Sequence, residues 1–230
     1  MTDPAAPAGR HWRRLTGSAW FHLIVAFVLV GLVLSFVAKP YRVPSVSMEH
    51  ALQPGDLVLV NRLAFAGTPP NTGDVIVFDA GDAWDSEIDS SGDPLRWLGE
   101  ATGFGPSSPH TLVKRVIGSS GQTVECCSAD GRVMIDGAAM HEPYVTNDPA
   151  FQAGVLDCET TPRSRRCFDP VLVPVNSYLV LGDNRGSSSD SAARCRTEQS
   201  TAACWRWAAH DGIVGKAAVI LWPIDRWAAL

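Results

Sequence analysis

Apolar residues are concentrated in one long run near the N-terminus. Residues 15–38, LTGSAWFHLIVAFVLVGLVLSFVA, contain no Asp, Glu, Lys or Arg. A helix rises about 1.5 Å per residue, so a run of this length can cross a hydrocarbon core of about 30 Å. The pattern therefore predicts a transmembrane helix over 15–38, an N-terminal tail over 1–14 and a body over 39–230.

The charges that flank this run indicate its orientation. Three arginines precede it, whereas one lysine and one arginine follow it closely. This modest bias favours a cytoplasmic tail and a body on the outer side of the membrane. A cleaved secretory signal is the alternative, but its apolar region is only about 7 to 15 residues long, and Phe36 is too large for the −3 position of a cleavage site. We therefore expect an uncleaved anchor.

The body shows a different pattern, in which short alternating or β-branched runs are separated by Gly, Pro, Asn and Asp. Such runs are typical of strands, and no segment of helical periodicity is convincing after the anchor. The dipeptides Asp130-Gly131 and Asp136-Gly137 predict tight turns in a hairpin region over 123–145. The body is therefore expected to be mainly β, with strands over 56–65, 74–79, 112–118, 123–126, 132–137, 177–183 and 215–222.

Two stretches interrupt the strands and are expected to be insertions. Residues 80–110 are rich in Gly, Ser, Pro and Asp, which favours a surface insertion. Trp97, Leu98 and Phe104 leave an alternative, a segment over 94–104 that rests on the membrane surface. Residues 146–170 form the second insertion.

Charge and cysteine content narrow the function classes. A net charge of −5 and a pI near 5.6, with no extended basic stripe, argue against a nucleic-acid partner. All six cysteines lie in the body, where an oxidising compartment favours disulfides. The simplest bridges are Cys158 to Cys167 and Cys195 to Cys204. Cys126 and Cys127 either bridge each other or take separate partners. No repeated C-x2-C spacing supports a metal site.

Two serines, Ser45 and Ser47, lie in a Pro-Ser-Val-Ser-Met turn just after the anchor. A nucleophilic serine needs a base, but the histidines are isolated and no G-x-S-x-G motif is present. Lys114 is the lysine that lies within an apolar strand. It can act as a base if burial lowers its pKa from about 10.4 to about 7 or 8. The alternative is a solvated strand lysine.

The chain carries four segments in a characteristic order: PSVSM after the apolar run, GDLVLVNRLAF, KRVIG followed by GQTV, and GDNRGSSSDS. Together they resemble the conserved boxes of bacterial type I signal peptidases over residues 20 to 192. The resemblance implies a largely antiparallel β domain on an N-terminal anchor, with a Ser/Lys dyad and neither metal nor cofactor. It identifies Ser47 as the nucleophile and Lys114 as the general base.

The resemblance also implies roles for neighbouring residues. Ser45 would help the N–H of Ser47 to stabilise the oxyanion, and Ser188 would hydrogen-bond Lys114 and orient it. Arg115 and Asp183 would form a structural ion pair.

The chain departs from the family pattern at two places. Ala192 stands where an arginine would pair with Asp190, so either Arg194 substitutes for it or the pair is absent. Glu49, His50 and Ala51 follow Ser-Met where x-Pro-Thr is common. Both departures concern local loop geometry rather than the dyad.

The function that the resemblance implies is a single-pass endopeptidase of the plasma membrane, with its catalytic domain outside the cytoplasm. Its partners would be secretory preproteins and the lipid bilayer, and it would remove signal peptides after small residues at −1 and −3. The substrate would add as a β strand beside apolar walls from residues 39–48 and 74–79.

Three other functions use parts of the same pattern. A Ser/Lys self-cleaving repressor shares the dyad but not the anchor or the cysteines. An inactive membrane-anchored β-domain that binds envelope partners would be expected to lack at least one of Ser47, Lys114 and Ser188. A penicillin-binding acyl transferase requires S-x-x-K, whereas this chain has His50 three residues after Ser47.

Overall fold

The computed structural model describes residues 18–81, 84, 111–197 and 202–230. Most of the predicted insertion over 80–110, including the candidate membrane-surface segment over 94–104, lies outside these residues. The tail over 1–14 also lies outside them.

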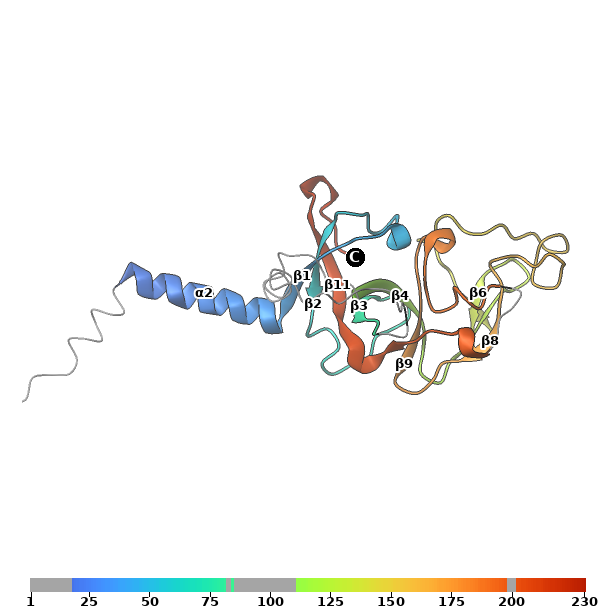
Figure 1. The fold of residues 1–230 in the computed structure, drawn as a ribbon, viewed down its shortest axis with the longest axis horizontal. Coiled ribbons are helices and arrows are strands. Elements are labelled where there is room, and N and C mark those ends of the chain that lie inside the picture. Colours follow the sequence, from blue (N-terminus) through green and yellow to red (C-terminus); the bar gives the residue numbers. More distant parts are fainter. Residues whose placement is uncertain (1–17, 82–83, 85–110, 198–201) are drawn as a thin grey trace, which may run out of the picture.

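The apolar run forms one helix, α2 (Ala19–Phe36). None of its residues is buried, and within the described part of the chain it is the helix that is long and apolar enough to cross a membrane. Figure 1 shows α2 extending away from the β body, with strand β1 following it directly. An 18-residue helix is about 27 Å long, which matches the apolar thickness of a bilayer.

The body is built on a seven-stranded antiparallel sheet in the order β1-β2-β11-β3-β4-β9-β10. The last long strand of the chain therefore lies inside this sheet, where β11 pairs with β2 on one side and β3 on the other. These strands are β1 (Ala38–Arg42), β2 (Leu57–Asn61), β3 (Val75–Asp79), β4 (Thr111–Ser119), β9 (Ser177–Leu181), β10 (Ala208–Ala209) and β11 (Ile213–Trp222).

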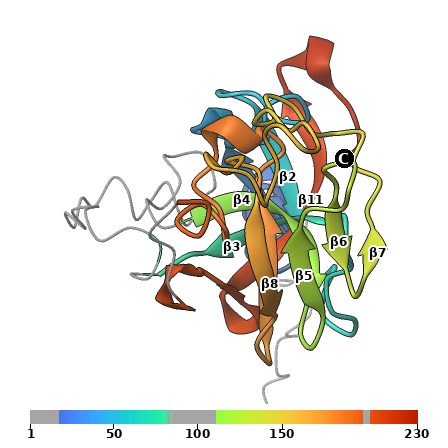
Figure 2. The same ribbon diagram turned by 90° about the vertical axis from the view of Figure 1, so that its right-hand side faces the viewer.

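A second, four-stranded sheet packs beside the first in the order β7-β6-β5-β8 (Figure 2). Its strands are β5 (Thr123–Cys126), β6 (Val133–Ile135), β7 (Ala138–Ala139) and β8 (Phe168–Leu172). Asp136 and Gly137 form the turn from β6 to β7 with positive φ angles of 50° and 80°, as the Asp-Gly signal predicts. The mainly antiparallel β fold is confirmed.

The strands that sequence analysis missed are short or lie at sheet edges. β1 contains Pro40 and pairs only with β2, while β8 contains Pro170 and pairs only with β5. A proline has no N–H to donate to a neighbouring strand, so within a sheet it is tolerated mainly in edge strands. Because proline in a sequence argues against a strand, these two edge strands were not predicted. The predicted insertion over 146–170 is wrong at its end, because β8 begins at Phe168.

Short 3₁₀ turns complete the described body. They are η1 (Val46–Met48), η2 (Arg185–Ser187), η3 (Ala202–Cys204), η4 (His210–Gly212) and η5 (Ile224–Arg226). Three disulfides are present, including both simple bridges expected from spacing. Cys126 and Cys127 bridge each other, which is one of the two alternatives.

The two sheets share a core where β4 passes toward β5. Ile117, Leu179 and Leu181 from the larger sheet pack in one cluster with Val124 and Phe168 from the smaller one. Gly118 lies at this junction, and a methyl group there would overlap the side chain of buried Val124. The same strand β4 also carries Lys114, the residue that the resemblance implies as the base.

Replacing Gly118 should therefore destabilise the body. We expect Gly118→Ala to lower the free energy of unfolding by about 2 kcal/mol, since an extra methyl in a packed core typically costs about 1 to 3 kcal/mol. Gly67→Ala is the matched control, because nothing lies within 4 Å of a methyl at that position. Urea unfolding in detergent, followed by tryptophan fluorescence, measures both variants. Equal stabilities for the two would contradict this packing.

Candidate active site

Ser47 lies in the 3₁₀ turn η1, which follows the edge strand β1 and the Pro44 turn. The backbone of this turn is held from outside: the Asn184 N–H donates to the Ser47 carbonyl at 3.1 Å, and the Thr146 hydroxyl donates to the Glu49 carbonyl at 2.8 Å. The side chain of Ser47 faces inward, and only 6% of the residue is exposed. The candidate nucleophile is therefore fixed in place by segments far away in the sequence.

Lys114 lies on β4, between β3 and β9, and only 3% of it is exposed. Its Nζ lies 2.8 Å from the Ser47 Oγ and 3.1 Å from the carbonyl oxygen of Val113. The structure thus brings together the two residues expected to form the dyad, although 67 positions separate them in the sequence.

Burial decides the ionisation of Lys114. Loss of water around the amine lowers its pKa from the ordinary value to about 8, against the opposing effect of the Asp190 and Asp183 carboxylates. A lysine with this pKa is partly neutral near pH 7 and can accept a proton, which an ordinary lysine cannot do.

Ser45 is close enough to act with the nucleophile. Its Oγ lies 3.2 Å from the Ser47 Oγ, and either hydroxyl can be the donor. The residue is exposed on the solvent side of the turn, where an incoming substrate would contact it. This geometry is compatible with the oxyanion role implied by the resemblance.

The hydrogen bond expected between Ser188 and Lys114 is absent from this structure. The Ser188 Oγ is buried and has no partner among the described residues. A methyl group on Gly182 would touch both this oxygen and the Ser47 carbonyl oxygen, so Ser188 does lie next to the site. The Lys114 amine is satisfied instead by Ser47 and Val113.

The ion pair between Arg115 and Asp183 is present in bidentate form, with N···O distances of 2.8 Å and 2.6 Å. Arg115 also donates to the Gly73 carbonyl at 2.8 Å, and its guanidinium lies 3.9 Å from the centre of the Tyr144 ring. Burial acts to lower the pKa of Arg115, but the hydrogen bond and the charge of Asp183 outweigh it and raise that pKa, so the guanidinium stays charged beside Lys114. The pair fixes β4 against the loop that follows β9.

Asp190 has a different partner from the one expected. Arg196, rather than Arg194, lies 3.1 Å from its carboxylate. Ala192 is fully buried within the apolar core, a position with no room for an arginine side chain. The turn closed by the disulfide between Cys195 and Cys204 carries Arg196.

Sequence reasoning missed the residues that hold the nucleophile turn. Thr146 falls within a predicted insertion, and nothing in its sequence context indicates a role. Asn184 lies in the GDNR segment, and its side-chain amide donates to the Glu49 carboxylate at 3.3 Å. Glu49, which is unusual after Ser-Met, therefore helps to hold the turn that carries Ser47.

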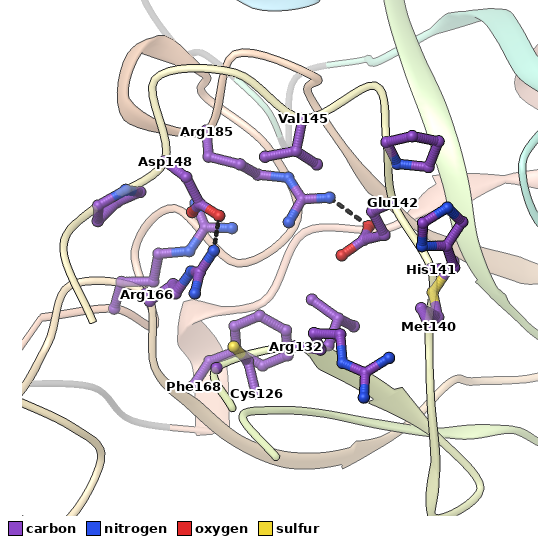
Figure 3. Close-up of a pocket in the computed structure, with 15 residues that line it drawn as sticks. Cys126, Arg132, Met140, His141, Glu142, Val145, Asp148, Arg166, Phe168 and Arg185 are labelled. Atoms are coloured by element: carbon purple, nitrogen blue, oxygen red, sulfur yellow. Dashed lines mark hydrogen bonds and ion pairs between the residues drawn. The ribbon is translucent and has the colours of Figure 1, made fainter. Parts of the chain in front are cut away.

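A charged cavity of about 210 Å³ lies beside the site, between the loop after β7 and the start of β8 (Figure 3). Neither Ser47 nor Lys114 lines it. Both acids of its lining are paired, Glu142 with Arg185 and Asp148 with Arg166. The other two arginines of the lining, Arg132 and Arg196, pair with acids outside it, Asp130 and Asp190. The arrangement is typical of a structural charge network.

The cysteine sulfurs offer the one grouping in the described part of the chain that resembles a metal site. The Sγ atoms of Cys127, Cys158 and Cys167 lie within 4.8 Å of one another. All three are in disulfides, so none is available as a thiolate ligand.

Comparison with known proteins identifies the family of this chain. Residues 17–222 match the family model described as signal peptidase, peptidase S26. Signal peptidase I of Mycobacterium tuberculosis is 37% identical over 215 residues, a match that covers 89% of this chain and 71% of that protein. Signal peptidase I of Leptolyngbya laminosa is 31% identical over 230 residues, covering 98% of this chain and 90% of that protein. On the extent of these matches, the chain belongs to the peptidase S26 family of signal peptidases and is a serine peptidase.

Proposed function

We propose that this peptidase removes signal peptides from exported preproteins by means of a Ser47 nucleophile and a Lys114 general base. The observation that carries the proposal is the 2.8 Å contact between the Lys114 Nζ and the Ser47 Oγ, made by a lysine with a pKa near 8. A nucleophile and a base within hydrogen-bond reach are the essential requirement of covalent serine catalysis.

The reaction follows from this contact. As the Ser47 Oγ attacks the scissile carbonyl carbon, neutral Lys114 takes the hydroxyl proton and becomes an ammonium. The ammonium then gives that proton to the leaving amine, which is the N-terminus of the mature chain, and an acyl-enzyme remains. Lys114, neutral again, removes a proton from the water that attacks the ester, and returns it to the Ser47 Oγ as the carboxyl end of the signal peptide leaves.

Ser45 and Ser188 have supporting roles in this proposal. The Ser45 hydroxyl turns from the Ser47 Oγ toward the developing oxyanion, where a fixed donor is worth far more than one in water. Ser188 has an unpartnered hydroxyl beside the site, so it can accept or donate a hydrogen bond when substrate changes the environment of Lys114. Arg115, Asp183 and Asp190 hold the backbone on either side of the amine.

The substrate would lie against apolar side chains near the start of the body. Val43 and Met48 pack in one buried cluster with Val75, while Tyr41 packs in another with Val77. Val113, which precedes the base, packs against both clusters. Walls of this kind favour small side chains at −1 and −3, because larger ones would displace a packed core.

The proposed location is the plasma membrane, with α2 crossing it once, the tail in the cytoplasm and the body outside. The apolar, unburied helix supports the membrane attachment, and the modest arginine bias supports the orientation. The disulfides are consistent with an oxidising compartment. An inactive envelope-binding domain is less well supported, because Ser47, Lys114 and Ser188 are all retained in one place.

Cleavage of a preprotein with Ala at −1, compared with a matched preprotein with Trp there, tests this function. We expect efficient cleavage of the first alone, because the apolar wall admits only a small side chain. Mass spectrometry of the products locates the cut. Ser47→Ala and Lys114→Ala should both leave the preprotein intact. A Lys114→Ala enzyme that kept near wild-type turnover would rule out the dyad.

The pH dependence of cleavage should report Lys114. The neutral amine is the active form, so log kcat/KM should rise with a slope near 1 below pH 8 and level off above it. Initial rates over pH 6 to 10 on a substrate without titratable groups measure this profile. A rate that was flat through the region near pH 8 would show that another group is the base.

Removing the hydroxyl of Ser45 should impair chemistry more than binding. For Ser45→Ala we expect kcat to fall by about 10² to 10³ with little change in KM, as is usual for loss of one oxyanion donor. Ser45→Thr, which keeps the hydroxyl, should recover most of the rate. Steady-state kinetics on both variants decide the matter. If Ser45→Ala kept the wild-type kcat, Ser45 would be a structural residue of the turn and not an oxyanion donor.

A further inference from the structure

A second hollow, of about 600 Å³, adjoins the cavity in Figure 3, since Asp148, Arg185 and Arg196 line both. It is formed by residues of the 147–165 segment and by residues 185–197, and we name it the arginine groove. Its charged lining consists of four arginines and one acid: Arg163, Arg165, Arg185, Arg196 and Asp148. No residue of this groove belongs to the apolar walls proposed for the signal peptide.

The arginine groove reaches the catalytic centre. Ser188 lines it, and the Ser188 Oγ and the Ser47 carbonyl oxygen flank the same residue, Gly182. The turn that carries Ser47 thus has apolar clusters from β1 and β3 on one side and η2 with the groove on the other. A chain bound at its scissile bond to Ser47, with its signal peptide against the apolar clusters, continues toward the groove.

The charges of the groove are less well neutralised than those of the cavity in Figure 3. Arg165 is exposed and makes no ion pair or hydrogen bond with any described residue. Arg163 pairs with Asp169, whose side chain is 68% exposed, and its buried Nε has no acceptor within the described ranges. Arg185 forms an ion pair with Glu142, and Arg196 forms one with Asp190. The free donor capacity of the groove therefore belongs to Arg163 and Arg165.

We propose that the arginine groove binds the first residues of the mature chain, beyond the scissile bond, and favours acidic side chains there. The proposal rests on the proposed function, because it gives the leaving segment of the same substrate a place to bind. Guanidinium groups suit this task, since their planar donors match a carboxylate and they stay charged at any physiological pH.

An anionic lipid surface is the other class of partner that arginines can bind, but the fold disfavours it. α2 leads directly into β1 at one end of the body, while the segments over 147–165 lie toward the opposite end (Figure 1). If α2 crosses the bilayer, these arginines lie on the part of the body farthest from the anchor. A polypeptide bound at Ser47 lies next to Ser188, which lines the groove, whereas a headgroup at the base of α2 lies at the other end of the body.

The expected effect is moderate because both arginines are near water. An exposed charge pair contributes about 0.2 to 1 kcal/mol, so two such contacts should change kcat/KM by about fivefold. The effect should appear in KM rather than kcat, because the carboxylates are held equally in the ground state and the transition state. It should also weaken in 0.5 M NaCl, which screens exposed charges.

The test uses the full chain in detergent with three peptides that share one signal-peptide half. Their mature halves begin with an acidic segment, the matching Asn/Gln segment or a Lys segment. Wild type should prefer the acidic peptide over the amide peptide by about fivefold in kcat/KM and should disfavour the lysine peptide. The double variant Arg163→Gln with Arg165→Gln should lose both preferences and cleave the three peptides with similar kcat/KM.

Arg194→Gln is the matched control. Arg194 is also an exposed arginine of this region, but it lines neither hollow. This variant should keep the preference for the acidic peptide. A wild-type enzyme that did not discriminate among the three peptides, or a double variant that discriminated as wild type does, would overturn the proposal. Failure to cleave any of them would instead reject the proposed function.

Vesicle flotation separates the lipid alternative from the peptide. Wild type and the double variant are reconstituted and mixed with vesicles of phosphatidylcholine alone or with added phosphatidylglycerol. Equal association of the two proteins with both vesicles is expected. Loss of binding to the phosphatidylglycerol vesicles in the double variant, with peptide preference unchanged, would assign the arginines to lipid and overturn the proposal.

Discussion

The proposed mechanism depends on one physical constraint, the exclusion of water from Lys114. Lys114 is almost fully buried on an interior strand, and desolvation lowers its pKa to about 8 although two carboxylates lie close enough to oppose the shift. The structure limits that opposition by giving each acid its own arginine, Arg115 for Asp183 and Arg196 for Asp190. In the proposed mechanism the neutral amine is the reactive form, so these ion pairs would support the base without taking part in proton transfer.

The same constraint explains the shape of the site. The Ser47 hydroxyl can reach a buried amine only if the turn points it into the body. Hydrogen bonds from Asn184 and Thr146 hold the backbone of this turn in place. These anchors come from a different part of the chain than either member of the dyad. Precise placement of a nucleophile generally requires such support, because a side chain on a free turn would sample many positions.

Sequence alone predicted much of this, and the failures have identifiable causes. The apolar helix α2, the strand β4 that carries Lys114 and the strand β9 that precedes Asp183 could be predicted because apolar residues dominate them. Edge strands such as β1 and β8 were missed because they contain proline and exposed charges. The dyad emerged from the order of four segments. The partner of Asp190 could not be ranked between nearby arginines, because that choice depends on how a disulfide-closed turn folds.

The position of β11 has a consequence for the order of synthesis. The β1–β2 hairpin frames Ser47, and the β3–β4 pair carries Lys114, but β11 alone joins these two pairs within the sheet. β11 follows both pairs in the sequence. A growing chain therefore contains Ser47 and Lys114 well before it contains the strand that aligns them. With the proposed dyad, a nascent polypeptide that has not yet added β11 would lack an aligned active site.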